Sequence, residues 1–161
     1  MDWNNALVEQ LDMHWTGQLR PRLDGLTDDE YFWEPVPNCW NVRPRGESTA
    51  PVQGGTGAFT VDFGPPTDPA PVTTIAWRLA HVIVGVLGAR VATHFGGPQM
   101  DYNDFDYAGT AEAALAQLDE TYKGWIEGVR SLSADQLAAP CGEPGYEQFP
   151  YAALVLHISR E

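Results

Sequence analysis

The sequence has little positive charge. It contains 9 Lys and Arg residues against 22 Asp and Glu residues, so its formal net charge is −13. Binding to the phosphates of nucleic acid or to an anionic membrane surface depends on clustered Lys and Arg side chains. No such cluster occurs along the chain. We therefore expect no nucleic acid and no membrane among its partners.

Cysteine and export signals are also scarce. Cys39 and Cys141 belong to no C-x-x-C or C-x-x-H spacing, so a thiolate zinc site is not expected and nothing demands a disulfide. The N-terminus lacks the basic and apolar regions of a signal peptide. The longest apolar run, around residues 75–91, is interrupted by charged and polar residues and is too short to span a bilayer. The sequence predicts a cytoplasmic protein.

The chain is long enough, at 161 residues with 43% apolar residues, to bury the core of one domain. Apolar side chains recur at helical spacing in four main segments. These segments cover about residues 3–23, 75–95, 111–129 and 151–161. Pro21 lies within the first one and predicts a kink or an early end of that helix near residue 19.

Two capping boxes predict short additional helices. In Thr27–Glu30 and in Ser133–Gln136, a hydroxyl side chain precedes Glu or Gln by three residues, so each side chain can satisfy a free backbone amide of the other. Between the first two main helices, residues 35–71 are rich in Pro and Gly and show no helical period. Alternation at Phe59–Phe63 predicts one short strand there, as part of a hairpin.

These patterns predict an all-α fold. We expect a single domain over residues 1–161, built as a four-helix bundle. A long irregular loop, with room for a small hairpin, would join the first and second main helices. The fourth main helix would be cut short at the C-terminus.

Three side chains form a candidate metal site. His157 and Glu161 are four residues apart, so on a helix they share one face, and His81 lies in the apolar second helix. Two imidazoles and one carboxylate suit a catalytic ion of the zinc type, with one position open for water or substrate. The alternatives remain open. A single histidine on an apolar helix is more often a hydrogen-bonded core residue, and a terminal glutamate is more often solvated.

Three further residues are candidates for substrate binding. Trp40 and Trp77 could line an apolar pocket beside the metal, although tryptophans are more often plain core. Arg43 could bind a carboxylate of a thiol cofactor or of the substrate. A salt bridge to one of the many acidic residues is the alternative for this arginine.

Two short segments resemble a known family. Trp77–Val82 (WRLAHV) and Leu156–Glu161 (LHISRE), together with Trp40 and Arg43 in the loop NCWNVR, resemble the DinB/YfiT-like superfamily and its DinB_2 (DUF664) branch. The resemblance implies a four-helix bundle that holds zinc or nickel by a histidine of the second helix and two residues four apart on the fourth.

The resemblance maps unevenly onto the expected metal ligands. His81 matches the first ligand, and Glu161 stands where many members have histidine but where the thiol-transferase branch is similar in using glutamate. The remaining ligand would lie one turn beyond Glu161. Either the metal site is incomplete in this chain, or His157 substitutes one turn earlier.

The same superfamily includes mycothiol-dependent maleylpyruvate isomerase and S-transferase enzymes. The resemblance therefore implies a metal-dependent enzyme that uses a thiol such as mycothiol to transfer or isomerise a small-molecule substrate. Its catalytic residues are not identified from the sequence. A metal-dependent hydrolase is the first alternative, and a metal-free dimeric scaffold without catalysis is the second. A homodimer is expected in each case.

Overall fold

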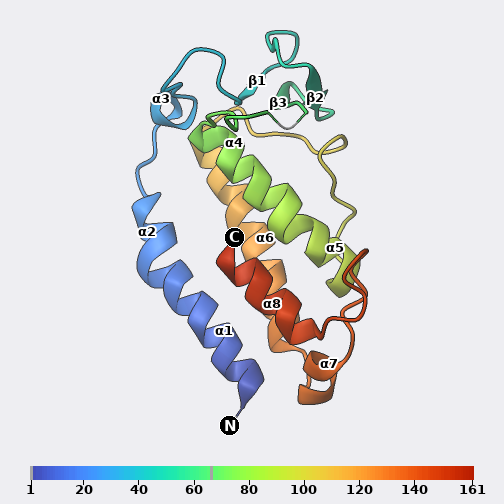
Figure 1. Cartoon of the computed structure of the whole chain (residues 1–161). Helices are drawn as coiled ribbons and strands as arrows, with labels where there is room; N and C mark the ends of the chain where they lie inside the picture. Colours follow the sequence, from blue (N-terminus) through green and yellow to red (C-terminus); the bar gives the residue numbers. More distant parts are fainter. Residues whose placement is uncertain (1, 66) are drawn as a thin grey trace.

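The computed structural model describes residues 2–65 and 67–161 (Figure 1). The chain begins with one continuous helical arm, formed by α1 (Trp3–His14), the π-helical segment η1 (Trp15–Leu19) and α2 (Arg20–Arg22). Pro21 lies in the first turn of α2, where its missing N–H is tolerated. The helical arm changes to π-helical geometry at Trp15 and continues through residue 19 to Arg22, so the predicted early end near residue 19 does not occur.

The second helical segment carries the central part of the candidate site. It consists of α4 (Ile75–Ala80), the π-helical segment η2 (His81–Gly88) and α5 (Ala89–Phe95). Thr74 caps its start by accepting a hydrogen bond from the Trp77 amide. Gly96 ends it with a φ of +70°, a conformation that glycine adopts without strain.

The third and fourth main helices follow as predicted. α6 (Ala111–Arg130) is capped by Thr110, and α8 (Tyr151–Arg160) begins after Pro150. The two predicted capping boxes are both confirmed, at the starts of α3 (Asp28–Tyr31) and α7 (Ala134–Ala138). α6 packs against η2, α5 and α1, and it buries an apolar seam that includes Leu118 and Trp125.

A three-stranded antiparallel sheet lies at one end of the helices, beside the start of α4 (Figure 1). Its strands are β1 (Val42–Pro44), β2 (Val52–Gly54) and β3 (Phe59–Phe63), and β3 lies in the centre. Val42 of β1 and Val52 of β2 pair with Val61 and Phe63 of β3. The three middle residues of β3 are all buried.

The all-α prediction is therefore wrong, because the fold mixes helices with this sheet. The strand predicted at residues 59–63 is confirmed as β3. It is not one arm of a loose hairpin, however, since it pairs on both sides and supplies Val61 to the hydrophobic core. Its partners β1 and β2 are only three residues long and leave little trace in the sequence.

The second helical segment is also longer than expected. Ile75–Phe95 covers 21 residues and is long and apolar enough to cross a membrane by length and composition. The prediction that this run is too short is therefore wrong. Half of its most apolar window is buried inside the protein, as in the core helix of a globular domain.

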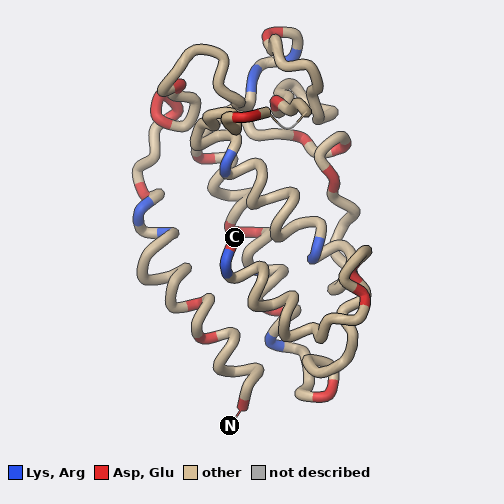
Figure 2. The backbone as a smooth tube through the Cα atoms, in the orientation of Figure 1, with Lys and Arg blue, Asp and Glu red and all other residues tan. Residues whose placement is uncertain are grey.

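Acidic residues outnumber basic ones, and the basic residues do not gather in one place. Among the described residues, Figure 2 shows the few Lys and Arg positions scattered along the backbone, while Asp and Glu positions recur along the helices and loops. This arrangement agrees with the reasoning from composition. That nucleic acid is not a partner stays a prediction.

The buried seam of α6 yields a test of the fold. Leu118 is 1% exposed, and its replacement by Ala should lower the free energy of unfolding by about 2–5 kcal/mol, because it removes buried methyl groups and leaves a cavity. Leu156 on α8 is 58% exposed, so Leu156→Ala is a matched control that should change stability by less than about 0.5 kcal/mol. Urea denaturation of both variants measures the difference, and equal losses would contradict this packing.

Candidate functional site

His81 occupies the first position of η2, where α4 changes to π-helical geometry. Its half-buried ring lies nearly parallel to two aromatic rings, those of Trp77 (centroids 5.4 Å apart, 12° between planes) and Tyr102 (6.3 Å, 8°). Its Nδ1 is 2.6 Å from the Tyr102 hydroxyl. The imidazole is thus covered on one face by Trp77 and held at one nitrogen by Tyr102.

The electrostatic surroundings favour a neutral His81 ring. Burial lowers its pKa below the usual value, and the charges of Arg78 and Arg90 lower the pKa further. The charge of the Glu161 carboxylate acts in the opposite direction and raises the pKa. A neutral imidazole has a lone pair that can bind a metal or accept a proton.

The predicted pair on α8 does share one face. His157 Nδ1 is 3.7 Å from Glu161 Oε1, and the Arg160 guanidinium lies 3.0 Å from His157 Nδ1 and 3.5 Å from Glu161 Oε1. Both predicted ligands on α8 are exposed. Glu161 thus contacts the histidine of its own helix, whereas the effect of Glu161 on His81 is a charge effect on the pKa.

The three predicted ligands do not form a preassembled metal site. Within residues 2–65 and 67–161, no group of three or more His, Cys, Asp or Glu side chains lies close enough together to hold an ion. In kind the donors fit a divalent metal, since two imidazoles and a carboxylate are common ligands. In position, His157 contacts Glu161 and borders a neighbouring pocket, whereas His81 contacts Tyr102 and Trp77.

That pocket has a volume of about 310 Å³ and lies between α5, α8 and the loop that connects α7 to α8. Most of its surface is apolar, and its rim carries two arginines. It is lined by Arg90, Cys141, Glu143, Tyr146, Phe149, Ala153, Leu154, His157 and Arg160.

The connecting loop is fastened to α5 through Glu143. His94 Nε2 lies 2.7 Å from Glu143 Oε1, and Arg90 Nε lies 3.5 Å from the same oxygen. Arg90 also donates a hydrogen bond to the backbone oxygen of Gly85 in η2. Sequence reasoning missed this cluster, because Glu143 lies in an irregular loop and shares no motif with α5.

The two predicted tryptophans lie beside His81 rather than in this pocket. Trp40 and Trp77 are 5.8 Å apart between ring centroids, and each contacts Phe63 of β3 edge-on. Both tryptophans are half-buried. They form an aromatic wall next to the histidine, and their role in substrate binding stays a prediction.

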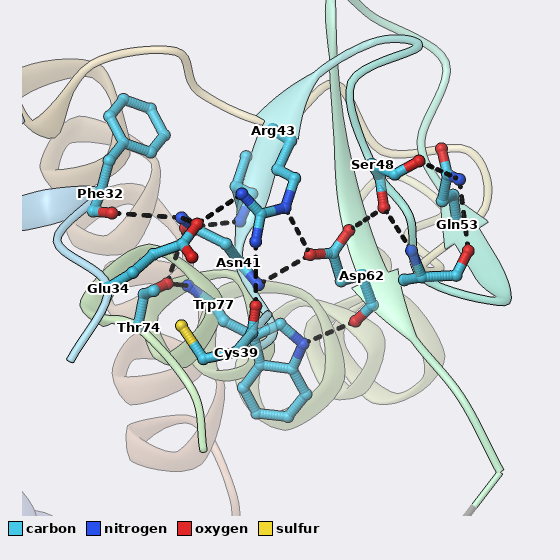
Figure 3. Close-up of polar contacts among 12 residues, drawn as sticks. Phe32, Glu34, Cys39, Asn41, Arg43, Ser48, Gln53, Asp62, Thr74 and Trp77 are labelled. Atoms are coloured by element: carbon cyan, nitrogen blue, oxygen red, sulfur yellow. Dashed lines mark hydrogen bonds and ion pairs between the residues drawn. The ribbon is translucent and has the colours of Figure 1, made fainter. Parts of the chain in front are cut away.

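A buried polar network beneath this wall joins the sheet to α4 (Figure 3). Its centre is Asp62 of β3, which is 2% exposed. The Asp62 carboxylate accepts hydrogen bonds from Arg43 Nε (2.9 Å), from the backbone N–H of Asn41 (3.0 Å) and from the Ser48 hydroxyl. The Asp62 backbone oxygen accepts one from the Trp77 indole (2.8 Å).

Arg43 belongs to this network with all three guanidinium nitrogens. It pairs with Asp62 and Glu34 and donates to the Cys39 carbonyl oxygen (Figure 3). Burial alone would raise the pKa of Glu34, but hydrogen bonds from Arg43 and Asn41 hold it below the usual value. These internal partners favour a structural role for Arg43, and its predicted contact with a substrate is untested.

These features define a class of protein: a helical domain capped by a small sheet, with a half-buried histidine on a main helix held by two aromatic side chains. The family model described as the DinB superfamily matches residues 10–161. The chain therefore belongs to the DinB superfamily, and the resemblance noted from its sequence is confirmed. Comparisons with curated proteins and with solved structures give no match.

The network around Asp62 yields a second test. Asp62→Ala should lower the free energy of unfolding by about 3–5 kcal/mol, because it removes the acceptor of three buried hydrogen bonds and one of the two carboxylates that pair with Arg43. The matched control is Asp119→Ala, whose carboxylate pairs with Arg20 but is 45% exposed and should contribute less than about 1 kcal/mol. Chemical denaturation distinguishes the two, and a small effect at Asp62 would show that the network does not stabilise the fold.

Proposed function

We propose that this member of the DinB superfamily is a divalent-metal-dependent enzyme that acts on a small molecule, with thiol-dependent S-transfer or isomerisation as its reaction class. The observation that supports the proposal best is the placement of His81. Burial favours the neutral form of its imidazole, Tyr102 and Trp77 hold the ring, and a pocket of small-molecule size lies beside His157 of α8.

The residues that would hold zinc or nickel are His81 and Glu161, with His157 as the third donor. When bound, such an ion lowers the pKa of a thiol such as mycothiol, so that a strong nucleophile exists at neutral pH. The chain's own contribution is to keep His81 neutral and oriented, and to supply a carboxylate on the facing helix. Ordering of the exposed α8 side chains would accompany binding.

The pocket beside α8 supports a small-molecule substrate. Phe149 and Leu154 give it an apolar wall, while Arg90 and Arg160 place positive charge at its rim. Guanidinium groups bind anionic groups well, and these two could do so in exchange for their contacts with Glu143 and Glu161. We therefore propose a substrate or thiol that combines an apolar body with a carboxylate.

A metal-free binding domain is the second candidate. It is favoured by one observation, the absence of a preassembled group of three ligands among the described residues. In that case His81 would be a hydrogen-bonded structural residue of η2, held by Tyr102 and Trp77, and the pocket would bind its ligand without chemistry.

The first test of this proposal is the metal content of His81→Ala. Protein purified without a histidine tag should carry about one zinc or nickel ion per chain, and His81→Ala should lose at least about nine-tenths of it, because one of three ligands is removed. Helical circular dichroism should be retained, since the ring is only half-buried. Elemental analysis by mass spectrometry measures the metal.

The control variant is His14→Ala, which removes an exposed histidine of α1 and should leave the metal content unchanged. Absence of metal from the unchanged protein would favour the scaffold. Turnover is then measured on electrophile–thiol pairs, with and without added zinc. Consumption of the thiol supports S-transfer, and hydrolysis of the electrophile without thiol would instead show that water is the nucleophile.

A homodimer is part of the same proposal. Trp3, Met13 and Leu19 are exposed on the N-terminal helical arm, and exposed apolar side chains of this size often mark an interface between subunits. We expect sedimentation to show a dimer at micromolar concentrations and Met13→Glu to weaken it at least about tenfold, because a charge would be buried. A monomer in the unchanged protein would contradict the proposal.

A further inference from the structure

Tyr102 reaches His81 from the segment between α5 and α6, far from the motifs that the sequence singles out. Three contacts fix it in place. Its ring meets Phe63 of β3 edge-on at 4.9 Å, its backbone oxygen accepts a hydrogen bond from the Tyr107 hydroxyl at 2.9 Å, and its hydroxyl lies 2.6 Å from His81 Nδ1. A phenol held in this way can fix the orientation of the imidazole it contacts.

Gly85 makes room for this hydroxyl. A Cβ atom at Gly85 would lie 1.9 Å from the Tyr102 hydroxyl oxygen and 2.7 Å from the ring carbon that carries it. Both distances are far below van der Waals contact. Glycine inside a helix costs about 1 kcal/mol relative to alanine. Gly85 lies about one turn after His81 in η2. Because it has no side chain, it leaves open the space that the Tyr102 hydroxyl occupies.

Within the described residues, His81 Nδ1 has the Tyr102 hydroxyl as its hydrogen-bond partner, and no partner is found for Nε2. The two nitrogens of a neutral imidazole are not equivalent, because the hydrogen bond made by one determines which role remains for the other. The stacked Trp77 ring restricts the plane of the imidazole from one face. When Nδ1–H donates to the Tyr102 oxygen, the lone pair remains on Nε2, which is then the nitrogen left for a ligand.

We propose that Tyr102, admitted by Gly85, is a positioning residue that occupies Nδ1 of His81 and so presents Nε2 as its working nitrogen. The proposal rests on the proposed function in one respect only, that His81 is the residue that acts. It assigns roles to two residues outside the motifs WRLAHV and LHISRE.

The test uses metal-free protein labelled with ¹⁵N in its histidine rings, studied by NMR at a pH where the rings are neutral. In the unchanged protein, the two His81 nitrogens should show widely separated shifts, as in a single tautomer. In Tyr102→Phe and in Gly85→Ala, the separation should shrink toward that of the exposed His14, because the hydrogen bond is removed in the first and pushed away in the second.

Two controls match these changes. Gly17→Ala adds a methyl group to a glycine of the other π-helical segment, η1, where nothing lies within 4 Å of the added atom. Tyr122→Phe removes a hydroxyl that bonds Asp12 away from this site. Both should leave the His81 nitrogens unchanged. If Tyr102→Phe also leaves them unchanged, the proposal is overturned, and this variant decides alone if Gly85→Ala fails to fold.

Zinc affinity, measured by competition with a chromophoric chelator, separates this inference from the proposed function. Loss of a partner that orients a ligand weakens metal binding by about 10–100-fold, so Tyr102→Phe should show at least the lower value. If the unchanged protein binds no zinc but the NMR result holds, positioning is correct and the metal-dependent function is wrong. If zinc binds equally well to the unchanged protein and to Tyr102→Phe, and their His81 signals agree, the positioning role of Tyr102 is wrong and the metal-dependent function stands.

Discussion

The buried carboxylate of Asp62 is the constraint on which the rest of the structure depends. A carboxylate with 2% exposure is stable only when hydrogen-bond partners surround it, and here three residues of the segment 41–48 supply them. Arg43 belongs to β1, the Asn41 backbone N–H lies directly before this strand, and Ser48 lies between β1 and β2. Satisfying one carboxylate thus fixes the mutual positions of the strands.

The same residue ties the sheet to the helices. The Trp77 indole donates to the Asp62 backbone oxygen, and Thr74 donates to the Asn41 side chain while capping α4. Trp77 in turn stacks on His81 one helical turn later. The imidazole is therefore oriented from the sheet end of the molecule through a row of side chains that are hydrogen-bonded or stacked on one another.

Local patterns were sufficient to predict the helices, but not the fold class. Capping residues and apolar periodicity gave the starts of α3, α4, α6 and α7, because these signals act within one or two turns. The sheet depends on pairing between strands of three to five residues. In β3 the alternation placed Asp62 on the polar face, which normally means solvent, whereas long-range partners bury it. The Pro- and Gly-rich composition around it is typical of a loop.

The candidate site divides in the same way. His81 and the pair on α8 follow from helical spacing and from the family motifs, since these are local features of the chain. Tyr102 and Glu143 come from irregular segments, and only the fold brings them to the site. The half on η2 is shielded and held by hydrogen bonds and stacking, whereas His157 and Glu161 are exposed and contact mainly each other and Arg160. Because ordering exposed side chains opposes binding, most of the ordering that the proposed ligand set requires would take place on α8 rather than at His81.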